Sequence, residues 1–317
     1  MLARTGDWLT RVGLTADLND LPSSPLTFPD GGLFRIEIPE VENPEVFDVM
    51  LQTAGVMGVP VHRVSQGTGI TRLGDQDLRD MGAMASAGNI GLFLFMGVRG
   101  ENGLSAQPRS RAGGSTRKRL QGATQILYAL EDVYRALEAG VRGFLISDEG
   151  LLSVLDQLRE QGEIPANVEL KTSVSMGHGN PASARVLWRL GANSFNMPVD
   201  LTLGAIAAIR RAIPLPLDIY IEAPADMGGS HRFHELPEIV RVAAPVHLKF
   251  GLSTEAATDP VGLHLQSTAN LQVKERVRLA AVGLEVLERA GLTSRMSPVG
   301  EGRTANPAGT PHLLDGA

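Results

Sequence analysis

The chain has 317 residues, a formal net charge of −6 at pH 7 and no cysteine. Without cysteine, the chain can form neither a disulfide nor a thiolate nucleophile, and it cannot hold an iron–sulfur cluster through cysteine ligands. The acidic balance argues against a nucleic-acid-binding surface over the whole protein, although a local basic patch is compatible with it. The longest apolar stretches, such as the one that starts at Ile90, are far shorter than the ~20 residues of a membrane span. We therefore expect a soluble, cytoplasmic protein without membrane contact.

Short β-rich runs alternate with helical patterns along the chain. Strands are predicted at residues 33–38, 61–65, 90–96, 143–147, 168–174, 193–197, 217–222 and 246–250. Helices are predicted at residues 43–58, 75–88, 123–140, 148–162, 180–191, 202–213, 235–244 and 272–290. Eight strand–helix units indicate an α/β fold of the closed (β/α)₈ TIM-barrel type. An open, doubly wound sheet is the alternative, but the glycine-rich fingerprint expected after its first strand is absent.

The same pattern predicts one domain with two irregular parts. The barrel is expected to occupy residues 1–291, with a basic insertion at residues 97–122 after the third strand. The Gly- and Pro-rich residues 292–317 are expected to form a flexible tail. The apolar face at residues 277–287 could serve a homodimer, but packing in the core would explain it as well.

Chemistry in such a barrel lies at the carboxyl ends of the strands. Alternation along each strand points a set of charged side chains inward: Arg35, Glu37, Lys171, Glu222 and Lys249, with Asp218, Tyr220 and His247 on the same face. Buried charges are costly unless they are paired, so this set is either a structural ion-pair network or the base of an active site. Glu222 and Lys249 lie near strand ends and are the favoured catalytic residues.

A lysine inside a barrel also suggests Schiff-base chemistry, for which Lys171 and Lys249 are the candidates. That chemistry needs a neutral amine, whereas neighbouring carboxylates would keep the amine protonated.

The predicted loops after the strands add further candidates. His178 follows the fifth strand and is either a general base or a solvated loop residue. Asp148 is either a helix N-cap or a ligand of a divalent metal together with Glu222 and His231. Asn196 lies at a strand end, where its amide could orient a substrate. The remaining candidate substrate-binding residues are Arg35, Glu37, Arg99, the anion-cradling run Gly228, Gly229 and Ser230, and His264.

The insertion is strongly basic. Residues 99–119 contain Arg99, Arg109, Arg111, Arg117, Lys118 and Arg119 but only one acidic residue. Three interpretations are open: a solvated excursion, a lid over an anionic substrate, or a contact with RNA phosphates. No aromatic residue interleaves these basic residues, so base stacking is not supported.

The run GANSFNMPVDLTLGAIAAIR, residues 191–210, resembles the FN-x-P-x-DLTL segment of the U32 peptidase (collagenase-like) family. The resemblance extends over residues 140–251 and implies an α/β barrel. Asn196, Pro198 and Asp200 match the motif, and Glu222 lies where the family tends to place an acid. The family includes metal-dependent peptidases and members with a cysteine-held cluster. The stretch DIYIEAPADMGG…HELPEIVRVAAPVHLKFG, residues 218–251, also looks like an actinobacterial-type offshoot of that family. This chain has no cysteine, so the cluster chemistry cannot carry over to it.

The sequence thus leads to three hypotheses. The first is a U32-like hydrolase for a small anionic or peptide-like substrate, with Glu222 as acid or base, Lys249 and Lys171 polarising an oxyanion, and a divalent metal as the possible cofactor. The second is a lyase or aldolase acting on a carboxylated or phosphorylated metabolite through a lysine Schiff base or a metal. The third is a non-catalytic subunit that binds RNA or protein through residues 99–119.

Overall fold

Eight parallel strands form the centre of the described part of the chain. The computed structural model describes residues 3–14, 20–100, 106–254 and 262–299. Its strands are β1 (Phe34–Pro39), β2 (Arg63–Ser65), β3 (Gly91–Phe95), β4 (Gly143–Ile146), β5 (Glu169–Thr172), β6 (Phe195–Asn196), β7 (Leu217–Glu222) and β8 (Val246–Phe250). Its α-helices are α1 (Ala3–Arg11), α2 (Pro44–Met57), α3 (Asp75–Gly88), α4 (Gly122–Glu138), α5 (Glu149–Glu160), α6 (Pro181–Arg189), α7 (Leu203–Ala212), α8 (Leu236–Ala243) and α9 (Gln266–Arg289).

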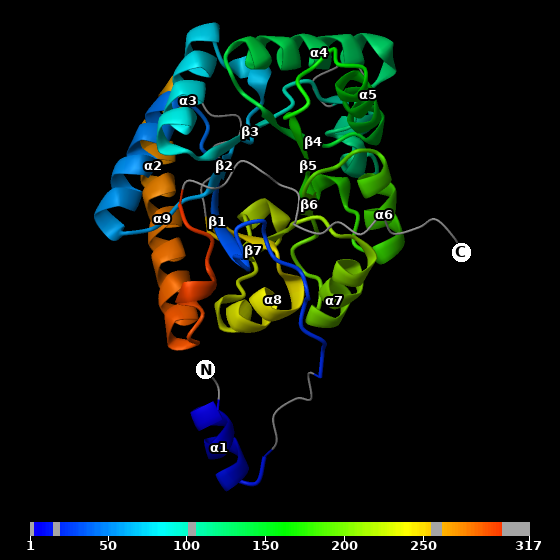
Figure 1. Cartoon of the computed structure of the whole chain (residues 1–317). Coiled ribbons are helices and arrows are strands. Elements are labelled where there is room, and N and C mark those ends of the chain that lie inside the picture. The colour runs from blue at the N-terminus through cyan, green and yellow to red at the C-terminus, as the bar shows by residue number, and fades with distance from the viewer. Residues whose placement is uncertain (1–2, 15–19, 101–105, 255–261, 300–317) are drawn as a thin grey trace.

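The sheet closes on itself between β5 and β6. Its hydrogen-bonded order is β5-β4-β3-β2-β1-β8-β7-β6, and neighbouring strands are parallel. A parallel bridge between Lys171 and Ser194 joins the two end strands, and the amide of Thr172 donates to the carbonyl of Ser194 at 3.0 Å. Helices surround the strands (Figure 1), so the fold is the TIM barrel that the sequence predicts.

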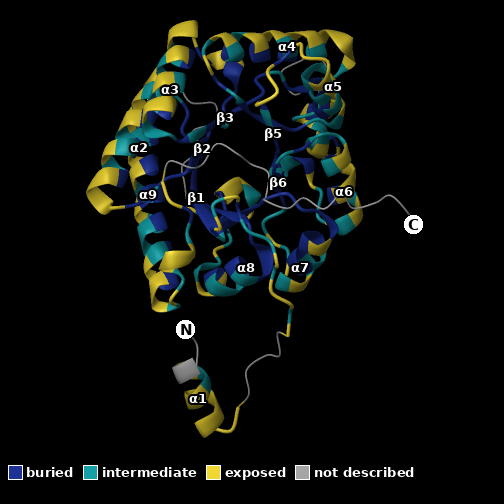
Figure 2. Ribbon diagram, viewed as in Figure 1, coloured by how far each residue is buried: buried dark blue, intermediate teal, exposed yellow. Residues whose placement is uncertain are grey.

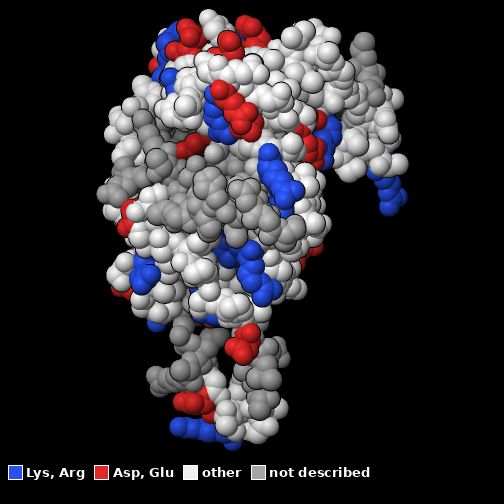
Figure 3. All heavy atoms as spheres, turned by 45° about the vertical axis from the view of Figure 1, so that its right-hand side comes forward, with Lys and Arg blue, Asp and Glu red and all other residues white. Residues whose placement is uncertain are grey.

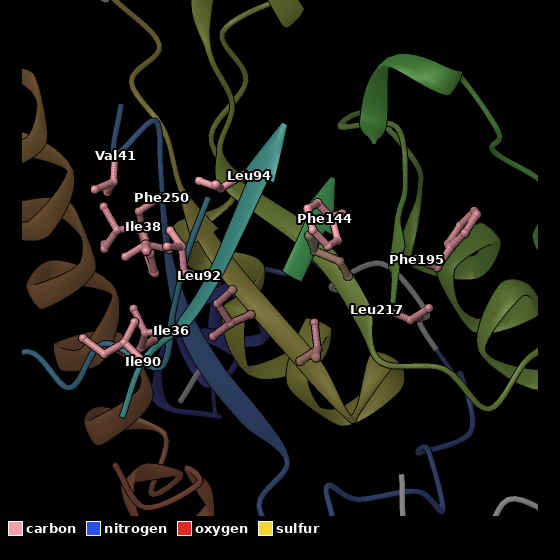
Figure 4. Packing of buried hydrophobic residues seen from close by; sticks show 14 of the residues in the cluster. Ile36, Ile38, Val41, Ile90, Leu92, Leu94, Phe144, Phe195, Leu217 and Phe250 are labelled. Atoms are coloured by element: carbon pink, nitrogen blue, oxygen red, sulfur yellow. The ribbon is translucent and has the colours of Figure 1, made fainter. Parts of the chain in front are cut away.

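The hydrophobic core lies between the strands and the surrounding helices. Outward-facing side chains such as Ile36, Ile38, Leu94 and Phe144 are fully buried, and Figure 4 shows Ile36 and Ile38 beside helix α9. Each surrounding helix turns a buried face to the strands and an exposed face to solvent (Figure 2). Because side chains alternate along a strand, the polar residues between these apolar ones point into the barrel.

Side-chain caps fix four of the predicted helix starts. Asn43, Asp148, Asn180 and Thr202 each accept a hydrogen bond from the backbone amide three residues further on. Such caps satisfy amides that the helix itself leaves unpaired. They direct the chain as it leaves the carboxyl ends of the strands, and they thereby shape the loops around the mouth of the barrel.

The amino-terminal helix α1 was not predicted. It has nine residues. Figure 1 shows it apart from the barrel, and its Trp8 is 53% exposed. Helix α9 is longer than predicted because it begins at Gln266. Among the described residues, no helix has the length and apolar character that crossing a membrane requires.

The barrel extends past residue 291, where the tail was expected to begin. The amide of Leu33 donates to the carbonyl of Arg295, and the amide of Ser297 donates to the carbonyl of Phe34. A bridge also joins Phe34 to Met296. Residues 293–297 therefore cross the amino-terminal end of the barrel, and residues 300–317 lie outside the described residues.

The apolar face of α9 at residues 277–287 packs inside the barrel's own core. Val277 and Leu287 are almost fully buried, and α9 lies along α2. This is the core packing that the sequence left open beside a dimer interface.

Candidate active site

Charged side chains fill the interior of the barrel. Strand pairing places Glu37 of β1 between Arg63 of β2 and Lys249 of β8. Arg63 Nε donates to Glu37 Oε2 at 2.7 Å, and its guanidinium also pairs with Asp218. Lys171 Nζ pairs with Glu37 Oε1 and lies 3.7 Å from Asp218 Oδ2. These side chains are almost completely buried, so the carboxylates and cations must satisfy one another.

The cluster contains three cations, Arg63, Lys171 and Lys249, but only two carboxylates, Glu37 and Asp218. Burial alone would raise the pKa of Glu37, but the charge of Arg63 and then that of Lys171 hold it well below its usual value. The pKa of Asp218 is lowered against the same burial effect by the same two cations. Lys249 is the third cation, and its Nζ lies 3.8 Å from Glu37 Oε1. Burial, followed by repulsion from Lys171, lowers the pKa of Lys249 to about 7.

A cavity of about 290 Å³ opens above this cluster, at the carboxyl ends of the strands. Its volume lies at the lower end of the ~300–1,000 Å³ typical of small-molecule sites. Polar and aromatic side chains from seven strand ends or the loops that follow them form its walls: Glu40, Glu42, Ser65, Gln66, Phe95, Lys118, Ser173, Asn196, Tyr220, Asp226 and Lys249. The position agrees with the expectation for a TIM-barrel active site.

Lys249 lies at the junction of the cavity and the ion cluster. Its Nζ is 3.9 Å from the centre of the Tyr220 ring. In the amide orientation that satisfies both neighbours, Asn196 Oδ1 accepts from Lys249 Nζ at 3.0 Å, and Asn196 Nδ2 donates to the carbonyl of Asp218 at 3.3 Å. Lys171 is not among the lining residues of the cavity. Of the two candidate lysines, Lys249 is thus the one that a substrate in the cavity would meet.

Two acidic residues follow β1 at the rim of the cavity. The carboxylate of Glu42 accepts from the amides of Gly67 at 2.9 Å and Thr68 at 2.7 Å, and burial raises the pKa of Glu42 to about 6. Glu40 has a left-handed backbone with φ of 58° and pairs with Arg276 of α9. A non-glycine residue in this region is strained, and such strain is often found at functional sites.

The structure places several sequence-predicted residues away from the cavity. Glu222 accepts from the amide and hydroxyl of Ser253 at 2.9 and 2.8 Å, and it is absent from the cavity wall. The amides of Gly228 and Gly229 donate to carbonyls within their own turn, so they do not form an anion cradle in this conformation. His264 is exposed on a short 3₁₀ helix.

The predicted metal ligands are not gathered. Asp148 caps α5 and also accepts from the amide of Leu120 at 3.2 Å. Glu222 and His231 pair only through a backbone bridge. Within the described residues, no group of three or more His, Asp and Glu side chains is arranged to hold a metal ion.

Arg35 lies at the opposite, amino-terminal end of the interior. Its Nη2 pairs with Asp30 Oδ2 at 2.7 Å, and its Nε donates to Ser297 Oγ at 3.0 Å. His62 Nε2 lies 2.8 Å from the Ser297 carbonyl. This cluster seals the end of the barrel away from the cavity, so Arg35 is not placed to touch a substrate there.

His178 and the basic insertion meet at the outer rim. His178 Nε2 lies 2.6 Å from Glu149 Oε1, and Arg119 pairs with the same carboxylate. Partial burial and then the charge of Arg119 lower the pKa of His178. Arg99 is buried, and its guanidinium donates to the carbonyl of Thr68 at 2.9 Å. His178 and Arg99 therefore organise loops around the cavity without lining it.

Residues 106–122 of the insertion, which follow its undescribed stretch, fold onto the rim. They contain the 3₁₀ helices Gln107–Arg109 and Gly114–Thr116, and Arg117 Nε donates to the carbonyl of Pro108 at 3.2 Å. Residues 101–105 lie outside the described residues. On the face that Figure 3 shows, the visible basic groups lie apart, and several adjoin acidic groups. The described residues visible on that face form no continuous basic field of the kind that nucleic-acid binding uses.

Some site residues were missed from the sequence. The alternation that predicted Glu37 would also have found Arg63 and Ser65 in the short strand β2. Glu42, by contrast, follows a strand in a loop, and no local pattern marks its contact with residues 67 and 68.

The chain thus combines a TIM barrel with a lysine and an acidic rim at the mouth of the barrel. No family model matches the chain, and no curated protein matches it. Among solved structures, it is similar to a 3-deoxy-D-arabino-heptulosonate 7-phosphate synthase from Thermotoga maritima, with 15% identity, coverage of 87% of this chain and 92% of the other, and a TM-score of 0.46. A 3-hexulose-6-phosphate synthase has 13% identity, coverage of 76% and 99%, and a TM-score of 0.40. A U32 peptidase has 14% identity, coverage of 66% and 73%, and a TM-score of 0.39. None of these similarities identifies the reaction.

Proposed function

We propose that the protein is a lyase of the aldolase type that holds the carbonyl carbon of a small substrate through a Schiff base on Lys249. The observation that carries this proposal is the position of the Lys249 amine. The amine is buried beside an ion cluster in which Arg63 and Lys171 already balance the two carboxylates, and it lines the cavity at the mouth of the barrel. Schiff-base lysines require an amine that is partly neutral near physiological pH, and desolvation beside other cations provides it.

The neighbours of Lys249 suit the steps of such a reaction. The neutral amine attacks the carbonyl carbon, and the carbonyl oxygen leaves as water after two proton transfers. The resulting iminium accepts the electron pair of the bond between the α- and β-carbons when that bond breaks. The hydroxyl on the β-carbon gives up its proton, the β-carbon leaves as an aldehyde or ketone, and an enamine remains on Lys249. The Tyr220 ring, 3.9 Å from Nζ, stabilises positive charge on this nitrogen. Glu42 lines the same cavity, and its pKa of about 6 suits it to exchange the protons.

Reductive trapping tests the proposal directly. The chain has only four lysines, Lys118, Lys171, Lys249 and Lys274, so an adduct can be assigned by peptide mass spectrometry. Incubation with pyruvate and cyanoborohydride is expected to label Lys249 selectively. The variant Lys249→Arg should lose the adduct, and the matched control Lys274→Arg, changed at an exposed site of α9, should keep it. Labelling confined to Lys118 and Lys274 would contradict the proposal.

A hydrolase of the kind that the U32 resemblance implies is the second candidate, and Glu42 is the observation that favours it. A carboxylate with a pKa near 6 at the cavity wall could act as general base towards water, a role first predicted for Glu222. In an assay on a mixed peptide digest, new amino termini that vanish in Glu42→Gln but persist in Lys249→Met would support hydrolysis. Metal analysis of the purified protein by plasma mass spectrometry tests the metal-assisted form.

A further inference from the structure

Lysine is rare in this chain, and its positions are not random. Only four of the 29 Lys and Arg residues are lysine. Lys171 and Lys249 lie inside the barrel, and Lys118 lines the cavity. Lys274 is exposed on the outer side of α9. Three of the four amines therefore lie at or near the cavity. The ion cluster accounts for Lys171 and the proposed Schiff base for Lys249, which leaves Lys118.

The backbone around Lys118 is held in place. Ser147, directly after β4, donates its hydroxyl to the carbonyl of Lys118 at 2.7 Å. The amide of Leu120 donates to Asp148 at 3.2 Å, and Asp148 is itself fixed as the N-cap of α5. The end of the basic insertion is thus tied to the end of β4, and Lys118 is delivered to the cavity wall by a fixed segment.

The cavity is polarised from one side to the other. Lys118 Nζ lies 5.3 Å from the centre of the Phe95 ring at the end of β3, and the guanidinium of Arg99 lies 4.7 Å from the same ring. Asp226 lines the opposite side, since it follows β7, which lies across the barrel from β3. Glu40 and Glu42 follow β1. A negatively charged group in the cavity is attracted to Lys118 on the β3 side and repelled by Asp226 and by the acidic residues that follow β1, while Lys249 of β8 lies at the base of the cavity.

We propose that Lys118 binds an anionic group, a carboxylate or a phosphate, of the substrate whose carbonyl carbon Lys249 holds. This inference rests on the proposed function and adds the class of substrate: a small carbonyl compound with a negative charge. An ammonium group binds either anion as a point charge. Lys118 is then the residue that selects anionic over neutral carbonyl compounds.

Pyruvate and hydroxyacetone form a matched pair of probes, because they share a carbon skeleton and differ in a carboxylate against a hydroxymethyl group. The rate of Lys249 labelling under cyanoborohydride is measured for the full chain and for Lys118→Gln, Lys118→Arg and the control Lys274→Gln. Lys118→Gln should slow labelling by pyruvate about tenfold, as expected for loss of one charge-assisted contact, and should leave labelling by hydroxyacetone unchanged. Lys118→Arg and Lys274→Gln should behave like the unchanged chain.

Equal slowing of both probes, or slowing of neither, would overturn the inference. Calorimetric titration with inorganic phosphate and with pyruvate measures anion binding directly. It therefore tests the anion site independently of the proposed Schiff-base function. If no probe labels Lys249 but phosphate binds the unchanged chain and not Lys118→Gln, the Schiff-base function fails and the anion site stands. If neither anion binds, or both bind Lys118→Gln equally well, the anion site fails. The tighter of the two anions distinguishes a phosphorylated from a carboxylated substrate.

Discussion

Lys249 is buried at a cost to the stability of the fold. Arg63 and Lys171 already neutralise Glu37 and Asp218, so a proton on Lys249 adds a third positive charge to a desolvated cluster. The protein tolerates this unfavourable group where the cavity begins. Functional sites often carry such destabilising groups because the chemistry needs them.

Replacing Lys249 by methionine should therefore stabilise the protein. Its pKa falls from 10.5 to about 7 on folding, which corresponds to about 4 kcal/mol at neutral pH. We expect Lys249→Met to unfold at a higher temperature and to gain about 2–4 kcal/mol at pH 7. The gain should shrink as the pH rises from 7 towards 10.5, because the unfolded lysine loses its proton there. A variant less stable than the parent at pH 7 would contradict this account.

The rate of the trapping reaction should depend on the protonation state of Lys249. Below its pKa, the neutral fraction of an amine rises about tenfold per pH unit. Labelling of Lys249 by pyruvate should rise in this way up to a pH of about 7 and then level off. Peptide mapping at a series of pH values gives the profile. A rate that keeps rising to pH 10 would show that Lys249 titrates like an exposed lysine.

Sequence alternation located most of the buried cluster but misplaced Glu222. The predicted residues Glu37, Lys171 and Lys249 lie on regular strands. Side chains alternate between the two faces of such strands, so the sequence indicates directly which of them point into the barrel. The pairing of β7 with β8 contains an irregularity between Tyr220 and Glu222, and an irregularity of this kind redirects the side chains after it. Its cause lies in the contact with β8, so the sequence of β7 alone could not reveal it.

At the scale of elements, the segment at residues 293–297 acts as a cover for the amino-terminal end of the barrel. Ser297 Oγ accepts from Arg35 Nε and donates to Asp30 Oδ1, both at 3.0 Å, and Ser297 is 1% exposed. Its removal would leave a buried guanidinium nitrogen without that partner. The cover is therefore held by polar contacts as well as by packing.

The variant Ser297→Ala should destabilise the protein by about 1–3 kcal/mol, which is the usual cost of an unsatisfied buried polar group. Chemical denaturation measures the free energy of unfolding. The exposed Ser86 of α3 provides the control, since Ser86→Ala should change it by less than ~0.5 kcal/mol. Equal effects of the two substitutions would argue against the role given to Ser297.

The same cover should make the fold sensitive to acid. Burial lowers the pKa of His62 to about 4 from 6.5, so the folded state stays unprotonated while the unfolded state binds a proton. Stability contributed by the neutral histidine is therefore lost as the pH falls from about 6.5 to 4. Burial and then the charge of Arg63 lower the pKa of His247 to about 3. His247 therefore adds a further loss of stability as the pH falls.

Unfolding measured between pH 7 and 4 tests the contribution of His62. His62→Asn should be less stable than the parent at pH 7, because it loses the contact with the Ser297 carbonyl, but its stability should fall less steeply with acid. The exposed His234 offers the matched control His234→Asn, which should retain the full slope. Parallel curves for parent and His62→Asn would refute the assignment.

At the scale of the whole molecule, the barrel could be predicted because eight units repeat the same order of strand, loop and helix. Closure and a strand at residues 193–197 were also predicted, but the contacts that close the sheet could not be. Strand β6 has only two residues, and no local pattern encodes the bridge between Lys171 and Ser194. The cover at residues 293–297 also lacks a strand or helix pattern, and its Gly- and Pro-rich surroundings favoured a loose tail.

A chain that ends at residue 291 should consequently be less stable than one that ends at residue 299. The shorter chain lacks Met296 and Ser297, and with them the backbone contacts to Leu33 and Phe34 and the side-chain contact to Arg35. Thermal unfolding of the two purified chains should differ by several degrees. Coincident transitions would mean that the barrel is complete without its cover.

The long reach of these contacts also bears on synthesis. Strand β1 is made before the other seven strands of the barrel, but it pairs with β8, and Phe34 bridges to Met296. The nascent barrel stays open until those last residues have left the exit tunnel. Until then, the charged inner faces of its first strands remain exposed to water. Contacts so distant in sequence slow folding and lengthen the exposure of unpaired strand edges. A translating cell must shield this half-built sheet until β8 and residues 293–297 have been made.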